Sequence, residues 1–213
     1  MIESQDRSLW FGASDCRYIM SDNCDSKTWK NWFAVKLGLA QNDFTGNIYT
    51  SAGNRYEHPI SEALNVTELD GTLYVPKYRL RVNYDGWKDG LICEIKTFRG
   101  DKEFPYEESP KNNYWRQCQV EMYCYMNCVQ NTTLPPQLPP IATDRKGKPY
   151  MLIVGYPLDA EEYYSDAEPI VDVSKLEVYQ VSYDRKWIKS CYLPKLKKLA
   201  RQLKKGIGGD DDG

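Results

Sequence analysis

The sequence lacks any long hydrophobic run. No segment approaches the roughly 18 consecutive apolar residues that a membrane-spanning helix needs. The first twelve residues, MIESQDRSLWFG, contain no apolar stretch of the kind found in secretory signal peptides. We therefore expect a cytoplasmic protein that is not secreted.

Histidine is almost absent, and the cysteines do not form metal-binding pairs. His58 is the one histidine, which excludes sites that need several imidazoles. Seven cysteines occur without a Cys-x-x-Cys pair, so we expect reduced thiols in a cytosol-like compartment. Cys124 and Cys128 are four residues apart on a predicted helix. Sharing a metal is one interpretation of that spacing, and burial as small apolar groups is the favoured one.

The composition is that of a folded globular protein with little net charge. The 213 residues are 41% apolar and 13% aromatic, which predicts a single domain over residues 1–213. The net charge of −2 argues against a protein that coats nucleic acid but allows a local basic groove. Residues 185–205 predict a basic helix distorted at Pro194, either a solvated amphipathic helix or a DNA contact. Residues 206–213 are expected to be a disordered tail.

The most informative segment is RLRVNYDGWKDGLICEIKT, at residues 79–97. Asp89-Gly90 is a dipeptide typical of a two-residue hairpin turn. Counting outwards from that turn pairs residues 88, 87, 86 and 85 with residues 91, 92, 93 and 94. Strand alternation then places Ile92, Glu94 and Lys96 on one face of the sheet.

This register sets two carboxylates, Asp85 and Glu94, directly opposite each other. Cβ atoms in such a pair are roughly 4.5–5.5 Å apart, and like charges at that separation are destabilising without a cation. A divalent metal ion is the natural candidate, since Mg²⁺ prefers carboxylate oxygens. Lys96 lies on the same face, where its ammonium can stabilise charge on a phosphate. The alternative is a solvent-exposed polar strand face with no catalytic role.

The remaining elements predict an α/β fold in which a mixed central β-sheet is flanked by α-helices. Helices are expected near residues 14–20, 27–37, 49–64 and 113–128, and further strands near residues 72–75, 78–84, 150–156 and 176–182. The first helix, capped by Ser14 or Asp15, would form a phosphate site together with Arg7, or a plain helix cap. On the helix at residues 113–128, Gln117 and Glu121 share one flank with Cys124, and both Gln117 and Gln119 are candidates to hold a water molecule or a phosphate.

Several short motifs now occur in one order along the chain. They are Arg7 and Ser14 in RSLWFGAS, Glu57 in GNRYE, Asp85 in DG, Glu94 and Lys96 in EIK, and Gln117 and Gln119 in YWRQCQVEM. This ordered set resembles the bacteriophage lambda exonuclease-type (YqaJ-like viral recombinase) branch of the PD-(D/E)XK nuclease superfamily. The resemblance covers about residues 7–128. It departs from the superfamily pattern at Tyr84, where proline is expected before the aspartate.

The resemblance implies a restriction-endonuclease-like core and a role for each matching residue. Asp85, Glu94 and the backbone carbonyl of Ile95 would hold one or two Mg²⁺ or Mn²⁺ ions, with Glu57 assisting from its helix. Lys96 would position the attacking water, and Gln117 would assist at the same site. Gln119, which with Tyr123 fits the glutamine–tyrosine motif of RecB-type nucleases, is a secondary candidate. Arg7 and Ser14 would hold a 5′-phosphate of the DNA end.

The predicted function is a metal-dependent deoxyribonuclease, a 5′→3′ exonuclease on double-stranded DNA ends in phage or viral recombination or DNA processing. The alternatives are a structure-specific endonuclease of the same superfamily and a non-catalytic DNA-binding recombination partner. An iron–sulfur nuclease is less consistent with the cysteine spacing. The resemblance also implies a single-strand annealing protein as partner and a ring-shaped trimer as the assembly.

Overall fold

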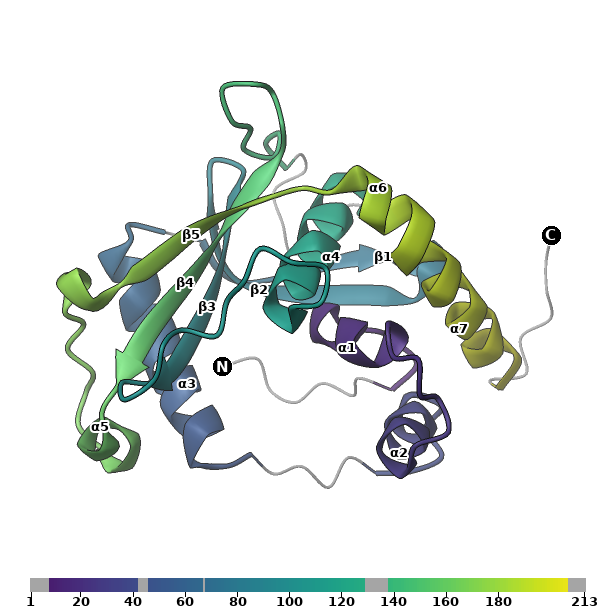
Figure 1. The fold of residues 1–213 in the computed structure, drawn as a ribbon, viewed down its shortest axis with the longest axis horizontal. Coiled ribbons are helices and arrows are strands. Elements are labelled where there is room, and N and C mark those ends of the chain that lie inside the picture. Colours follow the sequence, from purple (N-terminus) through teal and green to yellow (C-terminus); the bar gives the residue numbers. More distant parts are fainter. Residues whose placement is uncertain (1–7, 42–45, 67, 129–137, 207–213) are drawn as a thin grey trace.

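The computed structural model of the protein describes residues 8–41, 46–66, 68–128 and 138–206. Its strands form one five-stranded sheet in the order β1-β2-β3-β4-β5 (Figure 1). Strands β3 and β4 are parallel, and the other neighbours are antiparallel. The strands are β1 (Glu68–Val75), β2 (Leu80–Lys88), β3 (Leu91–Arg99), β4 (Tyr150–Leu158) and β5 (Glu177–Ser182).

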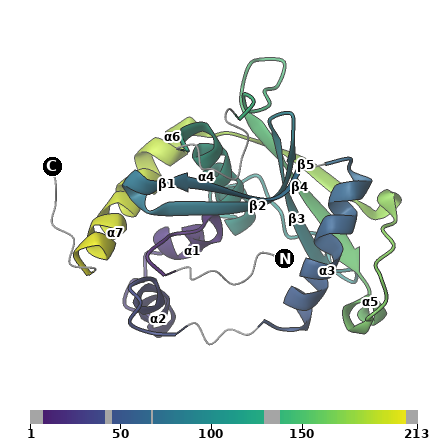
Figure 2. The same ribbon diagram turned by 180° about the vertical axis from the view of Figure 1, so that it is seen from behind.

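Helices cover both faces of this sheet, which confirms the predicted α/β architecture. Helix α4 lies over one face together with η1 and α1, and α3 crosses the opposite face near α5 (Figures 1 and 2). No helix in the described part of the chain has the length and apolar character needed to cross a membrane. The helical elements are η1 (Ala13–Asp15), α1 (Cys16–Ile19), α2 (Lys27–Lys36), α3 (Ile48–Ala63), η2 (Pro76–Tyr78), α4 (Asn113–Asn127), α5 (Ala160–Tyr164), η3 (Val173–Lys175), α6 (Arg185–Trp187), η4 (Ile188–Tyr192) and α7 (Leu193–Gly206).

Local capping signals set most of the helix starts. Ser26, Asn47 and Asn112 each accept a backbone hydrogen bond in the first turn of α2, α3 and α4. The sequence predicts a cap at Ser14 or Asp15 for the first helix, and Asp15 is the N-cap residue of α1, although its side chain makes no capping hydrogen bond to that helix. Gly12 is the N-cap of the preceding turn, η1. The backbone N–H of Gly12 donates to the Asp15 carboxylate at 2.7 Å. The side chain at the end of η1 thus forms a hydrogen bond with the residue that precedes this turn.

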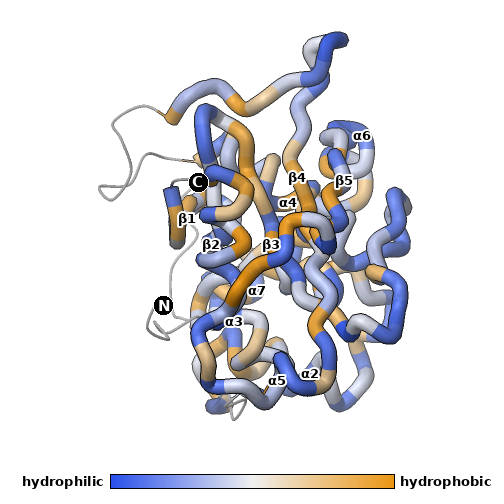
Figure 3. Tube along the Cα trace, turned by 90° about the vertical axis from the view of Figure 1, so that its left-hand side faces the viewer, coloured by the Kyte–Doolittle hydropathy of each residue, from blue (hydrophilic) through white to orange (hydrophobic). Residues whose placement is uncertain are grey.

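The central hairpin forms as the turn dipeptide predicts. Asp89 and Gly90 both have positive φ, at 51° and 83°, as a two-residue turn of this kind requires. The pairs at Lys88, Trp87 and Gly86 are those expected from the sequence. The alternation also holds, since Ile92 packs in the core on the α4 side and Ile95 in the core beneath α3. Figure 3 shows the resulting apolar centre along β3 and β4.

The C-terminal segment is helical from Arg185 to Gly206. A π-helical turn, η4, ends two residues before Pro194, which has no backbone N–H to donate. The distortion predicted at Pro194 therefore takes the form of this wide turn. Leu196, Leu199 and Leu203 are buried, so one face of α7 belongs to the core. Residues 207–213, which belong to the predicted disordered tail, lie outside the described residues.

The tight packing of Phe104 against the sheet can be tested at Gly155. It lies beside Lys96 in the β3–β4 pair, and a Cβ atom there would be 2.7 Å from the Phe104 ring. That ring is held between Phe98 and Tyr114, so it has little room to move. We expect Gly155→Ala to lower the free energy of unfolding by about 1–3 kcal/mol in urea denaturation.

The matched control is Gly53→Ala on α3, where the nearest contact of an added Cβ is Thr97 Oγ1 at 3.5 Å. Because glycine weakens a helix interior, this variant should be more stable by about 0.5–1 kcal/mol. Equal stabilities of the two variants would contradict the packing described at Gly155.

Candidate active site

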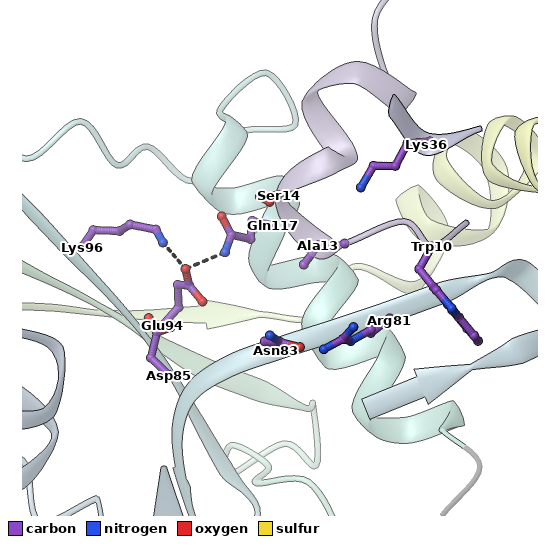
Figure 4. Close-up of a pocket in the computed structure, with 11 residues that line it drawn as sticks. Trp10, Ala13, Ser14, Lys36, Arg81, Asn83, Asp85, Glu94, Lys96 and Gln117 are labelled. Carbon is purple, nitrogen blue, oxygen red and sulfur yellow. Dashed lines mark hydrogen bonds and ion pairs between the residues drawn. The ribbon is translucent and has the colours of Figure 1, made fainter. Parts of the chain in front are cut away.

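A cavity of about 210 Å³ opens beside the central hairpin. Its walls come from the N-terminal segment, α2, β2, β3 and α4, so residues far apart in the sequence meet there (Figure 4). One side presents carboxylates and the other presents cationic and polar groups. The lining residues are Trp10, Gly12, Ala13, Ser14, Lys36, Arg81, Asn83, Asp85, Glu94, Lys96 and Gln117.

Asp85 lies at the point where β2 and β3 separate. The hairpin ladder ends at the Gly86–Cys93 pair, so the expected cross-strand pair of Asp85 and Glu94 does not continue it. Instead, the backbone N–H of Ile95 donates to Asp85 Oδ2 at 2.7 Å. The aspartate side chain bridges the gap between the strands, and both carboxylates still line the cavity.

Glu94 is the centre of the hydrogen-bond network. Its residue surface is only 2% exposed, and its Oε1 atom accepts from Lys96 Nζ and, at 2.5 Å, from Gln117 Nε2. Figure 4 shows these two contacts converging on one carboxylate from β3 and α4. The three residues that the sequence predicted to act together are thus in direct contact.

Glu121 extends this network behind the cavity. Gln117 Nε2 also donates to Glu121 Oε1 at 2.9 Å, one helical turn further along α4. Because both Glu94 and Glu121 accept from the amide nitrogen, the orientation of the Gln117 amide is fixed. Glu121 Oε2 is buried without a hydrogen-bond partner among the described residues. The sequence placed Glu121 on the flank of Gln117 but did not identify it as a site residue.

The carboxylates perturb one another and the neighbouring lysine. Burial and the charge of Glu94 raise the pKa of Asp85 well above its usual range, and the same two causes raise the pKa of Glu121. Burial works to lower the pKa of Lys96, but the carboxylates of Glu94 and Asp85 outweigh it and raise that pKa. Lys96 is therefore a cation whose charge balances the acidic cluster.

The opposite wall of the cavity is built around a buried ion pair. Lys36 is only 6% exposed, and its Nζ atom lies 2.6 Å from Asp15 Oδ2. Trp32 Nε1 donates to the other oxygen of Asp15 at 2.7 Å. This arrangement holds Lys36 beside the exposed Ser14, with Arg81 on the same wall. Sequence reasoning missed Lys36 and Arg81 because neither residue belongs to a motif.

The other predicted residues lie as follows. Gln119 points away from the cavity, where it accepts from the Asp184 backbone N–H at 2.6 Å and donates to the Ser182 carbonyl at 2.9 Å. Glu57 does not line the cavity, although its charge contributes to the raised pKa of Asp85. Arg7 lies outside the described residues.

The donor set suits a hard divalent cation. Among the described residues, no three His, Cys, Asp or Glu side chains are grouped closely enough to hold a metal by themselves. Asp85 and Glu94 nevertheless offer two adjacent carboxylates with strong mutual repulsion. Mg²⁺ commonly binds through one or two carboxylates and keeps water and phosphate oxygens as its other ligands. The residues therefore fit Mg²⁺ better than a metal whose ligands must all be protein side chains.

Comparisons with known proteins give likeness in structure alone. No protein-family model matches the chain, and no characterised protein is significantly similar to it in sequence. Among solved structures, the chain is similar to the alkaline exonuclease LHK-Exo from Laribacter hongkongensis, with a TM-score of 0.59 and 17% identity over 95% of this chain and 91% of that one. The same enzyme in complex with dAMP matches equally well.

A phage-related exonuclease from Haemophilus somnus 129PT is also similar, with a TM-score of 0.56 and 16% identity over 94% of this chain and 97% of that one. These matches cover almost the whole length of each protein, so the likeness extends beyond the hairpin to the flanking helices. The chain thus has the fold of the alkaline and phage-related exonucleases, which is the fold that its resemblance to the lambda exonuclease-type nucleases predicted.

Proposed function

We propose that the protein is a metal-dependent deoxyribonuclease that removes nucleotides from the 5′ ends of double-stranded DNA. The observation that carries this proposal is the convergence of Asp85, Glu94 and Lys96 on one cavity. The opposite wall carries Arg81 and the Lys36–Asp15 ion pair. The similar structures support it, since they are exonucleases and one of them binds dAMP. A cavity with carboxylates on one side and cations on the other suits a phosphodiester held next to a metal ion.

In this proposal, Asp85, Glu94 and the backbone carbonyl of Ile95 hold Mg²⁺ or Mn²⁺, and Glu57 assists from α3. When bound, the metal polarises the scissile phosphate and lowers the pKa of a water molecule. Lys96 orients the attacking water and stabilises the negative charge that develops on the phosphate. Gln117 donates to Glu94 and so fixes the carboxylate that faces the metal.

The wall opposite the carboxylates holds the DNA end. Ser14 and Arg7 are the predicted partners of a 5′-phosphate, and Arg81 lies on the same wall as Ser14. Such contacts bind the backbone and do not read bases, so cleavage should tolerate any sequence and weaken as salt rises. The partner protein and a ring-shaped assembly, both implied by the resemblance, remain predictions.

The direct test compares three DNA substrates in Mg²⁺: a linear duplex with a 5′-phosphate, a linear duplex with a 5′-hydroxyl and a closed circular duplex. We expect degradation of linear DNA only, and faster degradation with the 5′-phosphate. Lys96→Ala should lower kcat by about 10²–10³-fold, because one preorganised charge is removed from the transition state. Released nucleotides are measured against time.

Cleavage of the closed circle would favour the endonuclease alternative. Binding of DNA without turnover in Mg²⁺ or Mn²⁺ would favour the non-catalytic partner. Unchanged cleavage by Lys96→Ala would contradict the proposed mechanism outright.

The acidic cluster predicts how stability varies with pH in the absence of divalent cations. The folded-state pKa values of Asp85 and Glu121 are raised above those of unfolded carboxylic acids, which are about 4. Their stabilising contribution is therefore complete below about pH 4 and is lost as pH rises through the raised values. In EDTA, the melting temperature should fall as pH increases across that window.

Glu121→Gln removes one of these acids while keeping the side chain's size, so it should flatten this pH dependence. Mg²⁺ should also flatten it in the unmodified protein, because a bound cation offsets the repulsion. Parallel pH profiles of the variant and the unmodified protein in EDTA would show that the buried carboxylates do not control stability.

A further inference from the structure

The C-terminal helical segment has an extreme charge for a protein with a net charge of −2. Residues 185–206 contain nine lysines and arginines and no aspartate or glutamate, whereas the rest of the chain carries the other 19 basic residues and all 30 acidic ones. The hydrolytic site described above makes no use of this concentration of charge. Its basic residues are Arg185, Lys186, Lys189, Lys195, Lys197, Lys198, Arg201, Lys204 and Lys205.

The packing of α7 directs this charge to the surface. The leucine face of the helix is buried, so the basic residues between those leucines lie on the outer face. Lys197, Arg201 and Lys204 are all exposed and follow the spacing i, i+4, i+7, which places them in one row. That row spans about 10 Å along the helix axis.

The row continues from the wall of the active-site cavity through a chain of contacts. Trp10 lines the cavity, and the Arg79 guanidinium lies 5.6 Å from its ring centre. The preceding residue, Tyr78, has its ring covered by Lys77 at 5.9 Å and by Lys197 of α7 at 5.7 Å. Positive charge therefore extends from the cavity over η2 to the start of the row.

The far end of α7 lies against the end of α2. A Cβ atom at Gly206 would lie 2.7 Å from the Leu37 side chain, so the two residues are in close contact. Leu37 directly follows Lys36, which lines the cavity. Helix α7 thus packs against α1 and meets the end of α2 at Gly206, and both of these helices lie near the site (Figure 2).

We propose that Arg79, Lys77, Lys197, Arg201 and Lys204, here called the basic track, bind the phosphate backbone of duplex DNA outside the cavity. This proposal rests on the proposed function, because it takes duplex DNA as the substrate. Each strand of a duplex places one phosphate about every 3.4 Å along the helix axis, so a row of about 10 Å spans the rise of about three phosphates. The basic track binds the same duplex whose end enters the cavity, and because it contacts only phosphates, this binding does not depend on base sequence.

A phospholipid surface is the other polyanion that such a helix could meet, and the structure argues against it. Helices that lie on membranes insert an apolar face into the lipid. The apolar face of α7 is already buried against the core of this protein. Only its charged face is available, which suits a phosphate backbone in water.

The test measures DNA binding separately from hydrolysis. In a Lys96→Ala background, the triple variant Lys197→Gln, Arg201→Gln and Lys204→Gln is compared with a control triple variant that removes three exposed charges elsewhere, Arg145→Gln, Lys146→Gln and Lys148→Gln. Fluorescence anisotropy of a labelled duplex gives the affinity at several salt concentrations. Phosphatidylserine vesicles serve as the second probe.

The track variant should bind the duplex more weakly, and the slope of log K against log salt should become shallower. The expected change is about 0.9 for each phosphate that the protein no longer neutralises, or about 2–3 in all. The control variant should keep the original slope. Arg201→Gln alone, a milder change, should reduce the slope by about 0.9. In the active enzyme, the track variant should raise KM and leave kcat at saturating DNA unchanged.

Equal slopes for the track variant and the unmodified background would overturn the track while leaving the proposed nuclease intact. Equal losses of affinity in both triple variants would also overturn it, since net charge alone would then explain binding. A vesicle affinity that falls in the track variant while DNA affinity stays constant would assign the surface to lipid. No duplex binding by any form would overturn the proposed function as well.

Discussion

The arrangement of the site depends on repulsion between two carboxylates held at a point where strands separate. Asp85 reaches across the opening between β2 and β3 to the backbone N–H of Ile95, and Glu94 stands on the adjacent strand. Glu94 is buried and Asp85 is half-buried, and both line the cavity. The folded chain thus retains an acidic cluster that a cation relieves, and Lys96 supplies part of that compensation. A divalent cation bound between these carboxylates would therefore stabilise the folded protein.

The hairpin and its site residues were predictable because their signals are local. Asp89-Gly90 sets the turn, and the alternation of β3 places Glu94 and Lys96 on one face whatever surrounds them. The choice between Gln117 and Gln119 was not predictable. Side chains two residues apart on an α-helix point in nearly opposite directions. The rotation of α4 about its own axis, relative to the sheet, decides which of the two glutamines faces the cavity.

Residues missed by sequence reasoning owe their roles to tertiary packing. In the sequence, Lys36 looks like any lysine near the end of an amphipathic helix. Its place in the cavity wall follows from the tertiary contact with Asp15. Glu121 lies one turn from Gln117, but its burial follows from the depth at which α4 packs. Helix α5 carries a capping box at Asp159 and Glu162, yet five residues are too few for a hydrophobic period to show.

The most direct measurement of the central claim is a crystal structure of the protein soaked in Mn²⁺, with data collected at an energy where manganese scatters anomalously. We expect one anomalous peak between Asp85 and Glu94, about 2.0–2.3 Å from a carboxylate oxygen of each, with Lys96 displaced from Glu94. Absence of a peak there at millimolar Mn²⁺, with Lys96 still paired to Glu94, would contradict metal binding at this site. The acidic cluster would then be a structural ion pair that binds no metal.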